Sequence, residues 1–97
     1  MKICWTPTAR ITYFEILDYL AEKWTILEIK NFADEVEKIL SQIAENPYMF
    51  EATGKGKNIR KGFVTKHNTL YYRVKPRKKE IELITFWLNT KAPYKLI

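Results

Sequence analysis

The stretch from residue 58 to residue 75, NIRKGFVTKHNTLYYRVK, decides the fold because it is typical of a β-hairpin. Apolar and polar residues alternate on both sides of a turn at 66–68, so successive side chains point to opposite faces of a sheet. The second arm alternates Leu70, Tyr72 and Val74 against Tyr71, Arg73 and Lys75. The stretch carries five basic residues and no acidic one. It therefore predicts a hairpin with one apolar face and one polar face, on which Arg73 and Lys75 lie beside Tyr71.

The first arm of the hairpin, residues 58–65, alternates in the same way. Ile59, Lys61 and Phe63 fall on one face, and Arg60, Gly62 and Val64 fall on the other. A third strand is expected at 80–87, with Ile81, Leu83 and Thr85 on one face. Antiparallel strands of this kind usually bury one face and expose the other.

Two helices are expected before the hairpin. Thr6 followed by Pro7 is typical of a helix start, because Thr caps a free N–H and Pro at the first position loses no hydrogen bond. Thr25 and Glu28 match a capping box that begins a second helix, and Asn46-Pro47 ends it. The apolar series of the two helices, spaced by three and four, are Ala9, Tyr13, Ile16, Leu17, Leu20 and Trp24, then Ile29, Phe32, Ala33, Val36, Ile39, Leu40 and Ile43.

With a short strand at 2–5, the expected order is β-α-α-β-β-β. This order predicts an α+β fold in which a two-helix hairpin packs on one side of a curved antiparallel sheet. The 97 residues fit a single domain, 1–97, with little room for a second.

Charge is distributed unevenly along the chain. Residues 1–51 hold five basic and nine acidic residues, whereas residues 52–79 hold ten basic residues and no acidic one. Such asymmetry favours a negatively charged partner, nucleic acid above all. The alternative is a solvated basic face beside acidic helices.

Several classes of protein do not fit this sequence. No apolar run approaches the roughly 18 residues of a membrane span, and the first residues lack the apolar stretch of a signal peptide. Cys4 is the only cysteine, which excludes an internal disulfide framework. We therefore expect a cytoplasmic protein that needs no membrane, metal or other cofactor. Cys4 is read as a buried strand residue, and His67 as an exposed turn residue.

Basic residues interleaved with aromatic residues are the feature of this sequence that indicates binding or cleavage of nucleic acid. Lysine and arginine neutralise phosphates, and aromatic rings stack on unpaired bases. RNA cleavage without a metal needs a base that activates the 2′-OH and cations that hold the charge developing on the phosphate. The candidate catalytic residues are Arg60, Lys61, Lys66 and Arg73, and the candidate target-binding residues are Lys55, Lys57, Tyr71 and Lys75.

The chain resembles the RelE/ParE superfamily of bacterial toxins. The similarity extends over the whole chain and rests on the two-helix hairpin ending in ENPYMF, the hairpin quoted above, the strand IELITFW, and a tail with APYKL. It implies the β-α-α-β-β-β fold and the role of toxin in a type II toxin–antitoxin pair, neutralised by a cognate antitoxin. RelE-like members cut messenger RNA on the ribosome, and ParE-like members poison DNA gyrase.

The nuclease residues of RelE-like toxins are only partly matched. Arg60 falls where a strand lysine is expected, Thr69 falls where an arginine is expected, and residues 88–90 contain no Arg or His. Tyr94 lies near the position of a C-terminal tyrosine and joins the candidate binding residues. The resemblance leaves open the translating ribosome or gyrase as the target. There are two alternatives: a non-catalytic RNA- or DNA-binding module, and a degenerate toxin that only binds its antitoxin.

An acidic, amphipathic antitoxin segment is also expected. It would complement the basic face and the apolar residues Leu88, Leu96 and Ile97, and its binding would weaken with salt.

Overall fold

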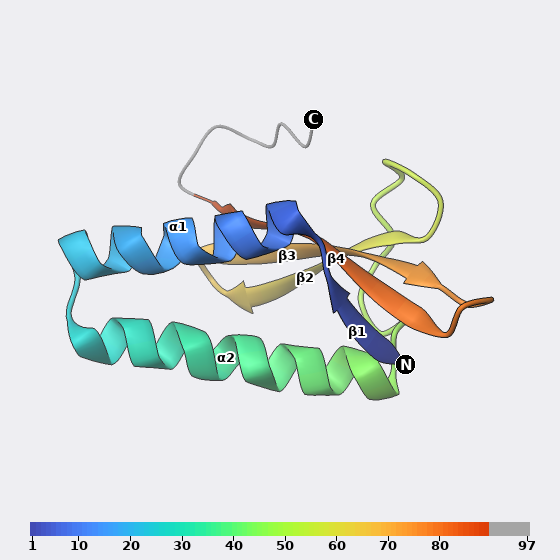
Figure 1. Ribbon diagram of the computed structural model, residues 1–97, viewed down its shortest axis with the longest axis horizontal. Helices are drawn as coiled ribbons and strands as arrows, with labels where there is room; N and C mark the ends of the chain where they lie inside the picture. Colours follow the sequence, from blue (N-terminus) through green and yellow to red (C-terminus); the bar gives the residue numbers. More distant parts are fainter. Residues whose placement is uncertain (90–97) are drawn as a thin grey trace.

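The computed structural model describes residues 1–89 and shows a helical hairpin packed on a four-stranded sheet (Figure 1). The predicted order and fold class are confirmed. The elements are β1 (Lys2–Trp5), α1 (Pro7–Lys23), α2 (Ile26–Glu45), β2 (Ile59–Thr65), β3 (Asn68–Lys75) and β4 (Glu80–Leu88). Within residues 1–89, neither helix is long and apolar enough to cross a bilayer. Tyr94, Leu96 and Ile97 lie outside the described residues.

The strands are arranged in the order β1-β4-β3-β2. β2, β3 and β4 are antiparallel neighbours, as expected. β1 adds to this arrangement in parallel with β4, with Lys2 opposite Glu80 and Trp5 opposite Leu83. Parallel neighbours need a long connection, and the helical hairpin together with the β2–β3 hairpin supplies it. The sheet is therefore mixed.

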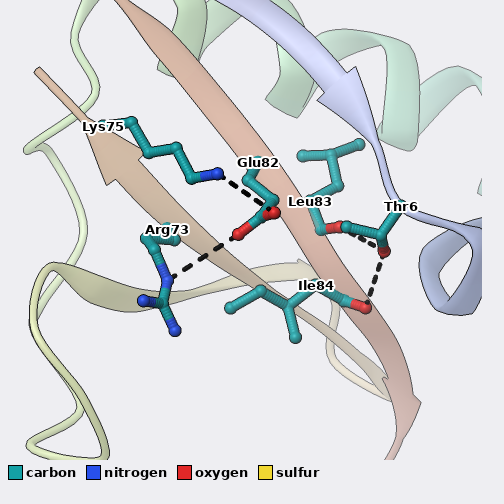
Figure 2. Close-up of polar contacts among 6 residues, drawn as sticks. All are labelled: Thr6, Arg73, Lys75, Glu82, Leu83 and Ile84. Atoms are coloured by element: carbon teal, nitrogen blue, oxygen red, sulfur yellow. Dashed lines mark hydrogen bonds and ion pairs between the residues drawn. The ribbon is translucent and has the colours of Figure 1, made fainter. Parts of the chain in front are cut away.

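One hydroxyl group joins the start of α1 to the sheet. Thr6 Oγ1 accepts a hydrogen bond from the backbone N–H of Ala9 at 3.0 Å, which confirms the predicted cap. The same Oγ1 donates to the carbonyl oxygen of Leu83 in β4 at 2.7 Å (Figure 2). The second expected cap differs, because Thr25 precedes α2 in an extended conformation but its side chain makes no capping hydrogen bond.

The core lies between the helices and one face of the sheet. Its largest fully buried side chains include Tyr72, Phe32 and Phe86. Tyr13 links the two layers, since its ring centroid lies 5.6 Å from that of Phe32 and 5.5 Å from that of Phe86. Trp24 is the exception to the predicted apolar face of the first helix. It is 57% exposed because α1 ends at Lys23.

An irregularity in the β3–β4 pairing changes which residues of β4 face the core. Tyr71 is paired with Thr85, but the next residue, Tyr72, is paired with Leu83. The extra residue in β4 shifts the alternation, so Phe86 follows Leu83 on the core face. The prediction that Thr85 shares a face with Ile81 and Leu83 is therefore wrong, although Thr85 is itself buried.

The segment after α2 covers the outer edge of β2. Ala52 forms an isolated bridge with Arg60, and the backbone N–H of Lys61 donates to the carbonyl oxygen of Glu51 at 3.2 Å. Phe50 packs where a side chain at position 62 would be, because a Cβ on Gly62 would lie 2.8 Å from the Phe50 ring. Gly62 therefore lets this segment dock on the helix side of β2.

Candidate target-binding surface

The face of β2, β3 and β4 that points away from the helices carries charged side chains from both arms of the hairpin. We call Lys61, Tyr71, Arg73 and Lys75 on this face the open-face cluster. On β3, Tyr71, Arg73 and Lys75 alternate with core residues, so their side chains leave the sheet on the side opposite the helices. Lys61 is the cross-strand neighbour of Tyr71, which brings β2 and β3 together in the cluster. The predicted polar face is thus present.

Glu82 of β4 organises two members of this cluster. Its carboxylate lies 3.7 Å from Arg73 Nε and 3.3 Å from Lys75 Nζ (Figure 2). All three side chains are partly exposed, so solvent screens these ion pairs and each stabilises the fold only slightly. Figure 2 shows that the two terminal nitrogens of Arg73 point away from Glu82. Glu82 therefore positions the guanidinium through Nε, and the two terminal nitrogens of Arg73 are not used in this ion pair.

Arg60 lies on the opposite, helix-facing side of the sheet. It is the cross-strand partner of the buried Tyr72, and its Nη1 donates to the carbonyl oxygen of Phe50 at 2.6 Å. Its guanidinium carbon lies 4.9 Å from the centroid of the Tyr48 ring, which is a cation–π distance. These contacts fix Arg60 as a link between β2 and the segment after α2. The structure therefore separates Arg60 from Lys61 and Arg73.

Tyr72 shares this environment with Arg60. Its hydroxyl donates to the carbonyl oxygen of Pro47 at 2.9 Å, and the residue is fully buried. Burial raises the pKa of Tyr72 to about 12, and the positive charge of Arg60 offsets only part of this effect. Arg60 and Tyr72 thus both hold the segment after α2 against the helix-facing side of the sheet.

Lys66 and His67 lie in the turn between β2 and β3, and His67 is exposed as predicted. They line a groove of about 410 Å³ between this turn and the ends of the helices. Its apolar wall includes Leu20, Phe32 and Leu88. Along β3, the seven steps from Asn68 to Lys75 span about 23 Å. Lys66 is therefore remote from the end of the open-face cluster that contains Lys75.

The rim of this groove carries apolar side chains that the sequence patterns did not assign to a surface. Trp24 also lines the groove, and Ile26 and Leu27 beside it are exposed at the tip of the helical hairpin. We call Trp24, Ile26 and Leu27 the helix-tip patch. The signal that could have found it is the break between the helices, since residues at such a break have no neighbouring turn to cover them.

A second hollow, of about 380 Å³, lies at the other end of the hairpin. Its lining includes the predicted residues Lys57, Arg73 and Lys75. Arg77 and Lys78 of the β3–β4 turn also line it, and neither was a candidate, although the run of basic residues in that turn was a visible signal. Lys55 is exposed in the preceding loop and does not line this hollow.

Metal-binding residue types are dispersed in the described part of the chain. In residues 1–89, no group of three or more His, Cys, Asp or Glu side chains is placed to hold a metal ion. Cys4 is a free, half-buried thiol on β1 rather than a fully buried one. Tyr94, the remaining candidate, lies outside the described residues.

The helical hairpin on an open mixed sheet, with this order of elements, is the fold of RelE/ParE superfamily toxins. The family model described as "ParE toxin of type II toxin-antitoxin system, parDE" matches residues 3–89. The chain therefore belongs to the ParE toxin family of type II toxin–antitoxin systems.

A solved structure shares the fold. It is described as a metal-bound toxin from Helicobacter pylori, and it is 12% identical with a TM-score of 0.66. The match covers 95% of this chain and 98% of that chain. At this identity the likeness shows the fold alone. Among curated proteins, none matches this sequence significantly.

Proposed function

We propose that this protein stops bacterial growth by acting on DNA gyrase and that a cognate antitoxin neutralises it. Membership of the ParE family supports the first part, because gyrase is the target that the resemblance implies for ParE-like toxins. A type II toxin also implies an antitoxin partner. We choose gyrase over the ribosome because of where the four candidate residues for RNA cleavage lie. These residues are Arg60, Lys61, Lys66 and Arg73.

Those four residues occupy three different places. Cleavage at a 2′-OH requires a base and charge-stabilising groups within hydrogen-bonding reach of one nucleotide. Arg60 faces the helices and donates to Phe50, and Lys66 lies in the β2–β3 turn. Of the four, only Lys61 and Arg73 share the open face. This separation favours a toxin that acts by binding its target over one that cuts RNA with this set.

The open-face cluster is the surface that we propose for target binding. It combines three cations with Tyr71, and Phe63 on the same face of β2 is 62% exposed. Arginine and aromatic residues are the types enriched in the strongest contacts of protein interfaces. The cations would meet acidic groups of the target, and the aromatic rings would supply apolar contact area.

The antitoxin is proposed to cover the helix-tip patch and the groove beside it. An apolar patch at a groove of about 410 Å³ suits an amphipathic segment, and Lys66 at the rim favours acidic residues next to it. The association rate should fall as salt rises, because exposed charges steer the encounter.

An in-cell experiment tests the proposed target. Wild type would be induced in bacteria beside a Lys61→Gln/Arg73→Gln variant and a control, Lys23→Gln/Lys38→Gln, which removes the same charge from exposed positions on the helices. We expect wild type and the control to arrest growth and to alter the supercoiling of a reporter plasmid, and the open-face variant to do neither. Growth arrest with unchanged plasmid supercoiling and cut messenger RNA would contradict gyrase as the target.

A further inference from the structure

The hollow at the β3–β4 turn has the composition of an anion site. We propose that it binds the phosphodiester backbone of a nucleic acid. We call the hollow the turn site and define it by Lys57, Arg73, Lys75, Arg77 and Lys78. It shares Arg73 and Lys75 with the open-face cluster, but the inference goes beyond the proposed function. Backbone binding would hold whether or not gyrase is the target.

The turn site gathers its charge from three segments. Lys57 comes from the loop before β2, Arg73 and Lys75 from the end of β3, and the other two cations from the β3–β4 turn. The backbone N–H of Val74 donates to the carbonyl oxygen of Asn58 at 3.0 Å and holds the loop against β3. Among residues 1–89, those lining the hollow include five cations and no acidic residue. Residues far apart in the sequence are thus held around one strongly basic hollow.

The donors of the site suit phosphate oxygens. Glu82 contacts Arg73 through Nε, at 3.7 Å, while the two terminal nitrogens point away from it (Figure 2). A guanidinium edge presents parallel N–H groups that match a phosphate group. Glu82 also lies 3.3 Å from Lys75 Nζ, so its single carboxylate neutralises part of the charge of two cations. Lys57, Arg77 and Lys78 are exposed, and none of them has an ion pair within the described residues.

The β3–β4 turn beside the hollow is tight and contains a lysine in a strained backbone conformation. Lys79 has φ +54°, in the left-handed region where a lysine is strained and a glycine is not. The turn is tight, since Lys78 N–H donates to Lys75 O and Lys79 N–H donates to Pro76 O, both at 3.2 Å. Three consecutive basic residues therefore occupy a turn in which glycine at the last position would remove the strain. Lys79 does not line the hollow, but it adds a third basic residue directly beside the turn site.

A nucleic acid fits this site better than a membrane surface. Proteins that lie on membranes combine basic residues with large apolar side chains that insert between lipids. Within the part of the chain that the structure describes, the only apolar residues lining the turn site are Val74, which is buried, and Pro76. Several cations around one open hollow instead favour a chain of phosphates, which releases bound counterions when lysine and arginine neutralise it.

Fluorescence anisotropy with the purified full chain tests the proposal. The probes are a labelled 20-base-pair DNA duplex, one of its strands, and an RNA of the same sequence, each titrated over a series of KCl concentrations. The test variant is Arg77→Gln/Lys78→Gln, and the matched control is Lys23→Gln/Lys38→Gln. Circular dichroism confirms that each variant is folded. A Lys57→Gln variant probes the site from a different segment.

We expect the control to bind as wild type does and the Arg77→Gln/Lys78→Gln variant to lose about tenfold or more in affinity at low salt. The slope of log K against log[KCl] for the duplex should become shallower by about 1.8 for the double variant and by about 0.9 for Lys57→Gln, since each phosphate contact contributes about 0.9. The three probes show whether the backbone bound is that of duplex DNA, single-stranded DNA or RNA.

Two results would overturn the proposal. The first is a failure of the double variant to differ as expected: an equal loss of affinity in the test variant and the control would mean that binding reflects net charge alone, and an unchanged salt slope would mean that Arg77 and Lys78 contact no phosphate. The second is competition by a polyglutamate peptide as effective as that of a nucleic acid with the same number of charges. Because gyrase is not present in this assay, failure here is separate from failure of the proposed target.

Discussion

Replacing Arg60 by methionine separates a structural role of this residue from a functional one. The change keeps the apolar stem but removes the guanidinium, which donates to Phe50 O at 2.6 Å and lies 4.9 Å from the Tyr48 ring. A hydrogen bond from a charged group contributes about 1.5–3 kcal/mol, and an exposed cation–π contact about 0.5–1 kcal/mol. Because Arg60 Nε is buried without a hydrogen-bond partner, its removal returns about 1 kcal/mol. We expect a net loss of about 1–3 kcal/mol.

Urea unfolding followed by tryptophan fluorescence measures this loss. A decrease of about 2 kcal/mol lowers the midpoint by about 1 M urea, given slopes of about 1–3 kcal/mol per M for small proteins. The variant should remain folded at 25 °C and should still arrest growth, because Arg60 is on the helix side of the sheet. Arg73→Met is the matched comparison, and we expect the reverse: a change of less than about 1 kcal/mol, since its ion pair with Glu82 is partly exposed, and loss of growth arrest.

The stability and toxicity of the two variants together distinguish a structural role from contact with the target. An Arg60→Met variant that unfolds at the wild-type urea concentration and no longer arrests growth would show that Arg60 contacts the target. An Arg73→Met variant that is as toxic as wild type would show that the open-face cluster is the wrong surface.

Three further predictions concern the fold. Thr6→Val should lower the free energy of unfolding in urea by about 2 kcal/mol, about 1 for the helix cap and about 1 for the bond to Leu83, whereas Thr6→Ser should stay near wild type. Burial raises the pKa of Tyr72 from 10.0 to about 12, so the unfolded chain loses this proton first. Stability should therefore fall by up to about 3 kcal/mol as the pH rises from 10 to 12, and Tyr72→Phe should lack this component when both proteins are unfolded over that range. Lys79→Gly should raise the melting temperature, because it relieves a strain of about 1 kcal/mol at φ +54°.

Local signals in the sequence predicted most of the fold. Spacings of three and four gave both helices, Thr6-Pro7 gave the first helix start, and alternation gave the hairpin. The parallel pairing of β1 with β4 was missed because strand neighbours distant in sequence leave no local pattern. The irregularity opposite Tyr71 and Tyr72 was missed for a similar reason. It inserts one residue into β4, and only the partner strand reveals it.

The candidate site was predictable only in part. Alternation already placed Arg60 and Lys61 on opposite faces of β2, but both faces mix charged and apolar residues, so the pattern did not show which one the helices cover. The structure settles this through Gly62, where a Cβ would meet the Phe50 ring at 2.8 Å. Phe63, apolar yet 62% exposed, lies on the other side. Packing of the segment after α2, rather than any feature of the hairpin, therefore determines which cations reach solvent.

A gyrase supercoiling assay with purified protein is the most direct test of gyrase as the target, with cell-free translation and primer extension on the messenger run in parallel. Wild type and the Lys23→Gln/Lys38→Gln control should inhibit supercoiling and leave translation and messenger intact, and the Lys61→Gln/Arg73→Gln variant should inhibit neither process. Normal supercoiling, together with messenger cuts that appear only when ribosomes are translating, would contradict the account.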